Sequence, residues 1–140
     1  MTTITDRMRE ALMQGLDADV RRLAQEAMVA GCPAKDILEQ GLIPAMEVIG
    51  ERFRTREIFL PDVLLAARAM HAGLEVVKPH LEGSTLMSRG TVVMGTVEGD
   101  LHDIGKNLVG IMLRGVGYEV LDLGTNISPA AFVDAARSHQ

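Results

Sequence analysis

One short segment of the sequence combines residue types that can bind a metal: Gly99-Asp-Leu-His-Asp-Ile-Gly-Lys-Asn107. His102 lies two residues after Asp100, and in an extended loop residues with this spacing project to one side. Asp100 can then accept the imidazole N–H, which fixes the tautomer and makes the other ring nitrogen a better metal donor. Gly99 and Gly105 permit close backbone approach or unusual dihedrals. The spacing alone leaves two interpretations open: a single-histidine metal site, or a hydrogen-bonded surface pair, which is the commoner case.

Other residues with potential chemistry have simpler interpretations. Asp103 can cap the helix that follows the loop, and Lys106 is predicted to be a solvated helix residue. Cys32 is the only cysteine, so it cannot form an internal disulfide, and it is predicted to be a buried or idle thiol rather than a nucleophile. The remaining histidines have no comparable setting and are predicted to be solvated: His71, His80 and His139.

The first part of the chain, from Thr5 to about Leu81, spaces its apolar residues by three and four, as amphipathic helices do. Pro44 should kink or restart one of these helices, because proline removes an internal hydrogen bond. Four helices with short connections predict a helical bundle. Their apolar stripes are Ile4–Leu12, Val20–Met28, Ile37–Ile49 and Val63–Leu74.

The period of the apolar residues changes in the last third of the chain. Thr91–Val97 is a short β-rich run of the kind found in buried parallel strands, and Tyr118–Leu123 is a second one. A helix is expected between them, from about Ile104 to Leu113. Ser128 and Pro129 are expected to open another helix. The order strand, helix, strand, helix predicts the start of a doubly wound α/β domain.

These patterns predict a helical domain over residues 1–84, a linker over 85–90 and an α/β domain over 91–140. Two strands are too few for a stable parallel sheet that is covered on both faces. We therefore expect the α/β domain to be truncated after its second strand–helix unit. Completion of the sheet by a partner chain is the alternative.

Composition narrows the functional class further. The net charge is −5 and there is no basic run, which argues against a nucleic-acid partner. The N-terminus lacks the pattern of a signal peptide, and no apolar run approaches the length needed to span a bilayer. These features predict a cytoplasmic protein with no membrane partner.

The segment Asp100-x-His102-x-x-Gly105 resembles the DxHxxG motif of cobalamin-binding Rossmann-like domains, and it follows the first strand as in that family. The wider stretch GDLHDIGKNLVGIMLRGVGYEVLDLG is similar to the cobalt-binding modules of methionine synthase and of corrinoid proteins in methyltransferase systems. The resemblance implies a flavodoxin-like domain whose cofactor is cobalamin. It makes His102 the lower axial cobalt ligand in place of the cofactor's dimethylbenzimidazole. It makes Asp100 the hydrogen-bonding partner of that histidine, and it includes in the cofactor-binding loop Gly99, Leu101, Asp103 and Gly105.

The helical part resembles the cap domain of the same families, which covers the methyl-bearing face of the cofactor. The resemblance lies in Gly50-Glu-Arg-Phe53-x5-Phe59-Leu-Pro-Asp-Val63-x2-Ala66-x3-Met70. It implies that Phe53 and Leu60 shield the methyl group, with Val63 nearby, and that Glu39 approaches the corrin.

The implied function is a corrinoid methyl carrier rather than a catalyst on its own. Such a protein binds cobalamin base-off and His-on. It shuttles a methyl group on cobalt between a substrate-specific methyltransferase and a second methyltransferase that uses a folate or thiol acceptor, and a reductive activator is a further expected partner. The sequence lacks the later Ser-x-Leu and Gly-Gly segments that enclose the nucleotide tail in the family. The alternatives are a cobalamin-dependent mutase subunit, a cobalamin-based sensor or regulator, and an interaction module without a cofactor.

Overall fold

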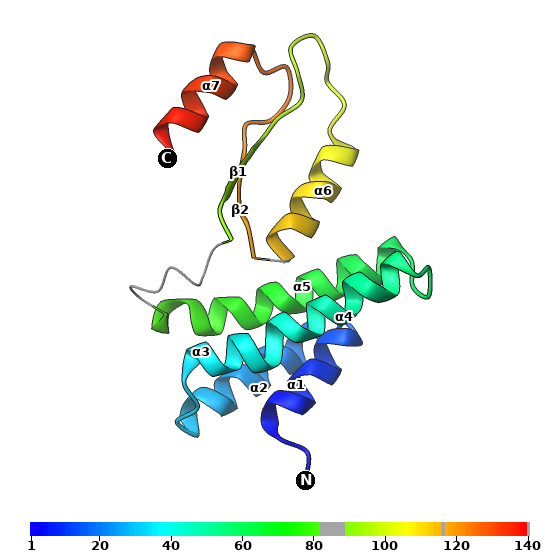
Figure 1. The fold of residues 1–140 in the computed structure, drawn as a ribbon, viewed down its shortest axis with the longest axis vertical. Helices are drawn as coiled ribbons and strands as arrows, with labels where there is room; N and C mark the ends of the chain where they lie inside the picture. Colours follow the sequence, from blue (N-terminus) through cyan, green and yellow to red (C-terminus); the bar gives the residue numbers. More distant parts are fainter. Residues whose placement is uncertain (82–88, 116, 140) are drawn as a thin grey trace. The chain divides into compact units, whose positions relative to one another are not determined.

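The computed structural model describes residues 1–81, 89–115 and 117–139, in two compact units, Met1–Met87 and Ser88–Gln140 (Figure 1). Most of the linker expected over residues 85–90 lies outside the described residues.

The first two helices form where the sequence supplies helix-starting groups. α1 (Ile4–Met13) begins after Thr3, whose side chain accepts from the backbone N–H of Asp6 while Asp6 accepts from the N–H of Thr3. This reciprocal capping box satisfies two N–H groups at the start of the helix. α2 (Asp17–Val29) follows a turn in which Gly15 has a φ of 73°. Both helices were predicted from their apolar spacing.

The third predicted helix is broken in a specific way. It consists of a short α3 (Ala34–Asp36), a π-helical turn η1 (Ile37–Leu42) and α4 (Ile43–Arg54). Pro44 lies in the first turn of α4, where the missing proline N–H costs no α-helical hydrogen bond. The expected interruption at Pro44 is therefore present, and it takes the form of a wider π turn just before the proline.

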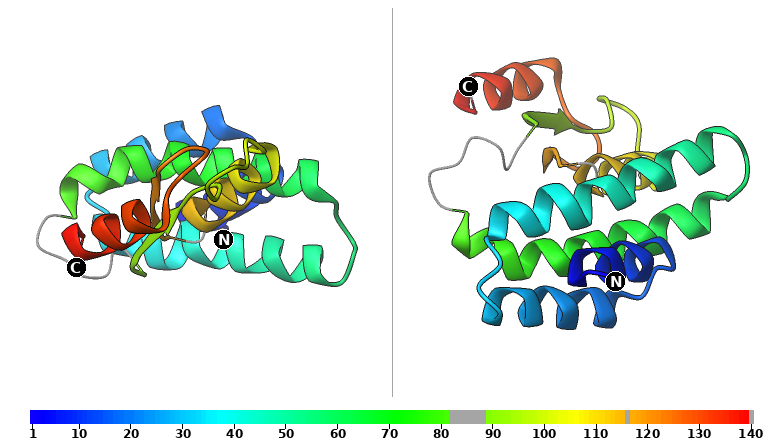
Figure 2. Two further views of the ribbon diagram at one scale, coloured as in Figure 1. Left: turned by 90° about the horizontal axis from the view of Figure 1, so that it is seen from above. Right: turned by 60° about the horizontal axis from the view of Figure 1, so that its bottom comes forward.

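The longest helix is α5 (Leu60–Val77), followed by the 3-10 turn η2 (Lys78–His80). α4 and α5 run antiparallel and are joined by the turn that both views of Figure 2 show. α5 also packs along α2, and Gly73 of α5 lets side chains of α2 and η1 approach its backbone closely. A Cβ at Gly73 would lie 2.7 Å from Leu42 Cδ2 and 3.0 Å from Val20 Cγ1. The core of the helical unit is aliphatic, and its largest fully buried side chains are Met8, Leu12, Val20, Ile37, Leu42, Ile49, Met70 and Val77.

The second unit has the predicted order β1 (Thr91–Met94), α6 (Ile104–Gly115), β2 (Glu119–Asp122) and α7 (Pro129–Ser138). β1 and β2 pair in parallel, with Thr91 opposite Glu119 and Met94 opposite Asp122. Figure 1 shows α6 and α7 on opposite sides of the two strands. The helices of the first unit and the βαβα order of the second confirm the prediction of a helical bundle followed by a Rossmann-like domain.

The two units bury their apolar residues to different extents. All the hydrophobic side chains that are fully buried in the described part of the chain belong to the helical unit. In the second unit Val97, Leu101 and Ile104 are 61%, 74% and 76% exposed. None of the helices within the described ranges is both long enough and apolar enough to cross a membrane.

Candidate functional site

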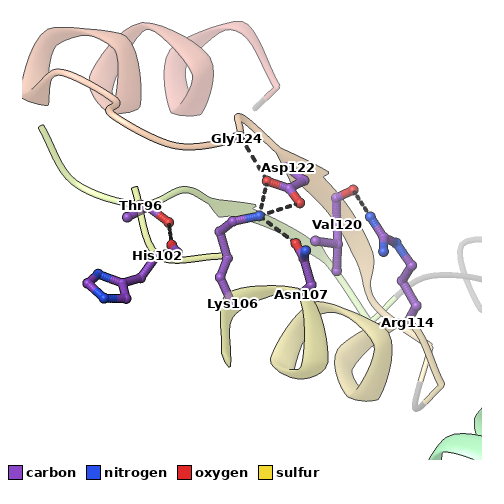
Figure 3. Close-up of polar contacts among 8 residues, drawn as sticks. All are labelled: Thr96, His102, Lys106, Asn107, Arg114, Val120, Asp122 and Gly124. Atoms are coloured by element: carbon purple, nitrogen blue, oxygen red, sulfur yellow. Dashed lines mark hydrogen bonds and ion pairs between the residues drawn. The ribbon is translucent and has the colours of Figure 1, made fainter. Parts of the chain in front are cut away.

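The loop that carries the candidate metal ligand begins where β1 ends, and Thr96 anchors it. Thr96 is the one polar residue in the described ranges that is fully buried, at 8% exposure. Its backbone N–H donates to Gly124 O (2.8 Å), and its carbonyl accepts from Ile127 N–H (2.8 Å). Its hydroxyl donates to the carbonyl oxygen of His102 at 2.6 Å (Figure 3). Thr96 therefore connects the extension of β1 to both the segment after β2 and the backbone of His102.

The segment after β2 holds the same loop through Asn126. Its Oδ1 accepts from the Gly99 N–H at 2.9 Å, and its own N–H donates to Asp100 O at 3.0 Å. Asn126 has a φ of 56° and Gly99 has a φ of 84°. Asparagine and glycine tolerate this left-handed region better than other residues do. The two hydrogen bonds bracket the peptide that links Gly99 to Asp100.

His102 and Asp100 form the predicted pair. His102 Nδ1 lies 2.5 Å from Asp100 Oδ1, and the His102 backbone N–H donates to the same oxygen at 3.0 Å. Hydrogen bonds from the backbone and ring of His102 lower the pKa of Asp100, and the acceptor in turn raises the pKa of His102. The His102 side chain is 96% exposed, and its ring points away from the other residues drawn in Figure 3. With Nδ1 engaged, Nε2 is the ring nitrogen that remains for a ligand.

Lys106 is not a solvated residue, and that prediction was wrong. Its side chain is only 11% exposed, and Nζ donates to both carboxylate oxygens of Asp122 (2.8 and 2.7 Å) and to Asn107 Oδ1 (2.7 Å). Asp122 also accepts from the Gly124 N–H at 2.9 Å. Lys106 holds the pKa of Asp122 below its ordinary value. The helix starting at Ile104 projects this ammonium across to the end of β2, where the carboxylate offsets the cost of removing it from water.

The other predicted loop residues lie at the surface around His102. Leu101 is 74% exposed. Asp103 accepts the Asn107 N–H at 2.8 Å through its backbone carbonyl, which starts the helical hydrogen bonding of α6. A Cβ added at Gly99 or Gly105 would meet no atom within 4 Å, so the space beside both glycines is open.

The residues predicted in the helical unit differ in exposure. Phe53 lies near the end of α4 and is 38% exposed, and Leu60 begins α5 half-buried. Val63 is 4% exposed and packs within the helical core. Glu39 lies in the π turn, and its carboxylate is 3.9 Å from the Lys35 ammonium. The role of these four residues in cofactor binding stays a prediction.

The arrangement suits a metal that arrives with most of its ligands already in place. One imidazole nitrogen faces outward on a loop whose glycines leave open space, and a carboxylate orients the ring from behind. A neutral imidazole held in this way is a good donor to a borderline metal ion. In cobalamin the corrin ring already holds the cobalt, so His102 would supply the single protein nitrogen that this group needs. The donor set therefore fits cobalamin.

Sequence reasoning did not find three residues that build this site: Thr96, Asn126 and Asp122. The signal was present in the topology, because the carboxyl ends of neighbouring parallel strands meet at one edge of a sheet. Thr96 follows β1, while Asp122 and Asn126 lie at and just after the end of β2. Polar residues at both strand ends could have been paired on that basis.

Comparisons with known proteins show the family of the chain. A family model described as a B12 binding domain matches residues 4–78, and a second model with the same description matches residues 90–140. A corrinoid protein of Desulfitobacterium hafniense is 38% identical over 138 residues, which cover 96% of this chain and 64% of the relative. Trimethylamine corrinoid protein 1 of Methanosarcina mazei is 40% identical over 136 residues, covering 96% and 63%. The chain thus spans somewhat less than two thirds of these relatives.

Solved structures give the same result. The methanol:cobalamin methyltransferase complex of Methanosarcina barkeri matches with a TM-score of 0.82 and 38% identity, over 96% of this chain and 52% of that one. The monomethylamine corrinoid protein of the same organism matches with a TM-score of 0.60 and 37% identity, over 97% of this chain and 64% of that one. The resemblance to corrinoid proteins of methyltransferase systems is confirmed by these relatives. The chain belongs to the family of B12-binding domain proteins, and its cofactor is cobalamin.

Proposed function

We propose that this chain is a corrinoid methyl carrier that binds cobalamin base-off, with His102 as the lower axial ligand of cobalt. The observation that carries the proposal is the outward-facing imidazole held at 2.5 Å by Asp100 at the carboxyl end of β1. Open α/β sheets bind ligands at this edge. The match of residues 90–140, which include this loop, to a B12 binding domain supports the proposal.

Asp100 and His102 have separate tasks in this proposal. Asp100 keeps the proton on Nδ1 and orients the ring, which leaves the Nε2 lone pair for cobalt. When bound, cobalamin would supply the cobalt centre that accepts and releases the methyl group, while the protein supplies orientation and surroundings. Protonation of Nε2 would remove the donor, so the protonation state of His102 sets whether the ligand is available.

In the helical unit we assign the exposed part of Phe53, together with Leu60, to shielding the methyl group from water. An apolar cover of this kind excludes water from a reactive centre. Val63 would support these two side chains from the core, and Glu39 would approach the corrin from the π turn. The loop residues Gly99, Leu101, Asp103 and Gly105 would contact the cofactor around His102.

The proposed partners are a substrate-specific methyltransferase and a second, acceptor methyltransferase that depends on a folate or a thiol, with a reductive activator. The names of the relatives support methylamines and methanol as candidate methyl donors. Charge supports protein partners over nucleic acid, since the chain is acidic at −5.

The test is the visible absorption spectrum of the protein reconstituted with cobalamin, compared with that of His102→Ala. We expect the spectrum of histidine-ligated, base-off cobalamin in the parent and its loss in His102→Ala. His71→Ala is a matched control, because His71 is also an exposed histidine but lies on α5 in the helical unit. A His102→Ala spectrum identical to that of the parent would remove His102 from the ligand role.

A further inference from the structure

The Asp100–His102 contact orients the ring relative to Asp100, but the pair is too exposed to hold the loop that carries both residues. The two side chains are 41% and 96% exposed, and exposed ion pairs contribute little free energy because water competes for both partners. A ligand must nevertheless be presented within a narrow range of positions to bind a metal well. The position of the pair must therefore be fixed by contacts of the backbone that carries it.

Two residues outside the DxHxxG motif supply that constraint, one at each end of the loop. Asn126 holds the peptide between Gly99 and Asp100 through one side-chain and one backbone hydrogen bond, at 2.9 and 3.0 Å. Thr96 holds the carbonyl of His102 through its hydroxyl at 2.6 Å. The loop is thus fixed immediately before Asp100 and at His102 itself.

The conformation of Asn126 indicates that its hydrogen bonds have a specific role. It is one of two residues other than glycine with a positive φ in the described ranges, at 56°. This conformation is unfavourable for most residues, and here it directs both the amide N–H and the side-chain oxygen of Asn126 at the same stretch of loop. Gly99, which receives the side-chain contact, is itself at a φ of 84°.

We propose that Asn126 and Thr96 are positioning residues that hold the Gly99–His102 backbone in the ligand-presenting conformation before cobalamin binds. This inference rests on the proposed role of His102 as the cobalt ligand. It predicts that removing either contact weakens cobalamin binding through the loop, without any direct contact between Asn126 or Thr96 and the cofactor.

The first experiment uses the cofactor-free protein. In Asn126→Ala the Gly99 N–H loses its acceptor. Loss of a hydrogen bond of ordinary strength should make amide exchange at Gly99 roughly five- to tenfold faster. Asn126→Asp keeps an acceptor oxygen and tolerates the positive φ, so it should restore most of the protection. Ser128→Ala is the control, because it removes the cap of α7, 3.2 Å from Ala131 N, in the same segment without touching the loop.

The second experiment adds cobalamin. Asn126→Ala and Thr96→Val should each bind it about tenfold more weakly and show a smaller histidine-ligated fraction, a typical cost of losing an outer-shell partner. Asn126→Asp and Thr96→Ser should recover both properties, since each keeps the group that makes the hydrogen bond. Ser128→Ala should match the parent.

Two results would overturn the inference. One is Gly99 exchange in Asn126→Ala equal to that of the parent, even with weaker cobalamin binding, because Asn126 would then touch the cofactor directly. The other is an unchanged histidine-ligated fraction in both Asn126→Ala and Thr96→Val. Failure of the proposed function looks different: the parent and His102→Ala would have the same spectrum, whatever stands at position 126.

Discussion

The ion pair between Lys106 and Asp122 connects α6 to the end of β2, and its removal should measurably destabilise the second unit. Lys106→Met keeps the apolar stem and removes the ammonium. Breaking a fully buried pair typically costs 3–5 kcal/mol, and an exposed pair contributes about 0–1 kcal/mol. Lys106 is 11% exposed and Asp122 is 32% exposed, so solvent screens the pair in part. Asp122 also retains the Gly124 N–H, and the expected loss is therefore about 1–3 kcal/mol.

The chain offers a convenient probe for this measurement. It has one tyrosine and no tryptophan, and Tyr118 directly precedes β2, so tyrosine fluorescence during urea unfolding follows the second unit. A double-mutant cycle of Lys106→Met and Asp122→Asn should give a coupling of about 1–2 kcal/mol near neutral pH. Arg137→Met is the control, since an exposed cation on α7 should change stability by less than about 0.5 kcal/mol.

The pH dependence supplies a second criterion for the same pair. Lys106 lowers the pKa of Asp122 in the folded protein. The contribution of the pair is therefore fully present above the unfolded pKa of an aspartate, about 3.9, and it is lost as the pH falls through the lower folded value. Additive single substitutions near neutral pH, or a coupling that persists in strong acid, would refute the assigned role of the pair.

Two further predictions concern other parts of the chain. Gly15→Ala should destabilise the helical unit by about 2–4 kcal/mol in thermal unfolding followed by circular dichroism, because φ is 73° and the new Cβ would lie 2.7 Å from Leu65 Cβ. Gly50→Ala is the control, because a Cβ at this position in α4 would meet no atom within 4 Å, and it should be neutral or stabilising. Equal effects of the two substitutions would contradict the prediction. Asp100→Asn should lower the pKa of His102 toward its ordinary value in an NMR titration of the cofactor-free protein, because Asp100 raises it. The stability that this pair contributes should be present below about pH 6.5 and lost as the pH rises through the folded pKa of His102; an unshifted titration in Asp100→Asn would show that the pair does not form in solution.

The elements of the fold could be predicted because their signals are local. Apolar spacing located the helices of the first unit, and the proline at position 44 correctly indicated an interruption. The form of the interruption, a π turn over Ile37–Leu42, could not be predicted in the same way. A π turn depends on how the helix packs against its neighbours, here with Leu42 in close approach to Gly73 of α5, and that is a tertiary effect.

The candidate site shows the same division between local and long-range information. The Asp100–His102 pair depends on a two-residue spacing and was visible in the sequence. The contacts of Thr96 and Asn126 with the loop depend on the register between β1 and the segment after β2, which the sequence does not specify residue by residue. The misassignment of Lys106 has the same origin, since its partner Asp122 is 16 residues away and becomes a neighbour only through parallel strand pairing.

In the proposed role of His102 as the cobalt ligand, its exposure and the restraint on its backbone serve a single physical requirement. An exposed ring needs no reorganisation before a large planar ligand covers it, and it becomes buried only on binding. The same exposure removes the packing that would otherwise limit its rotamers, and immobilising such a side chain costs about 0.5–1.5 kcal/mol. A loop that was also free would add the ordering of several backbone dihedrals, at about 1–2 kcal/mol per residue. On this proposal the hydrogen bonds from Thr96 and Asn126 remove that second, larger cost. We therefore expect these hydrogen bonds to the backbone to matter more for cofactor affinity than the strength of the Asp100–His102 pair.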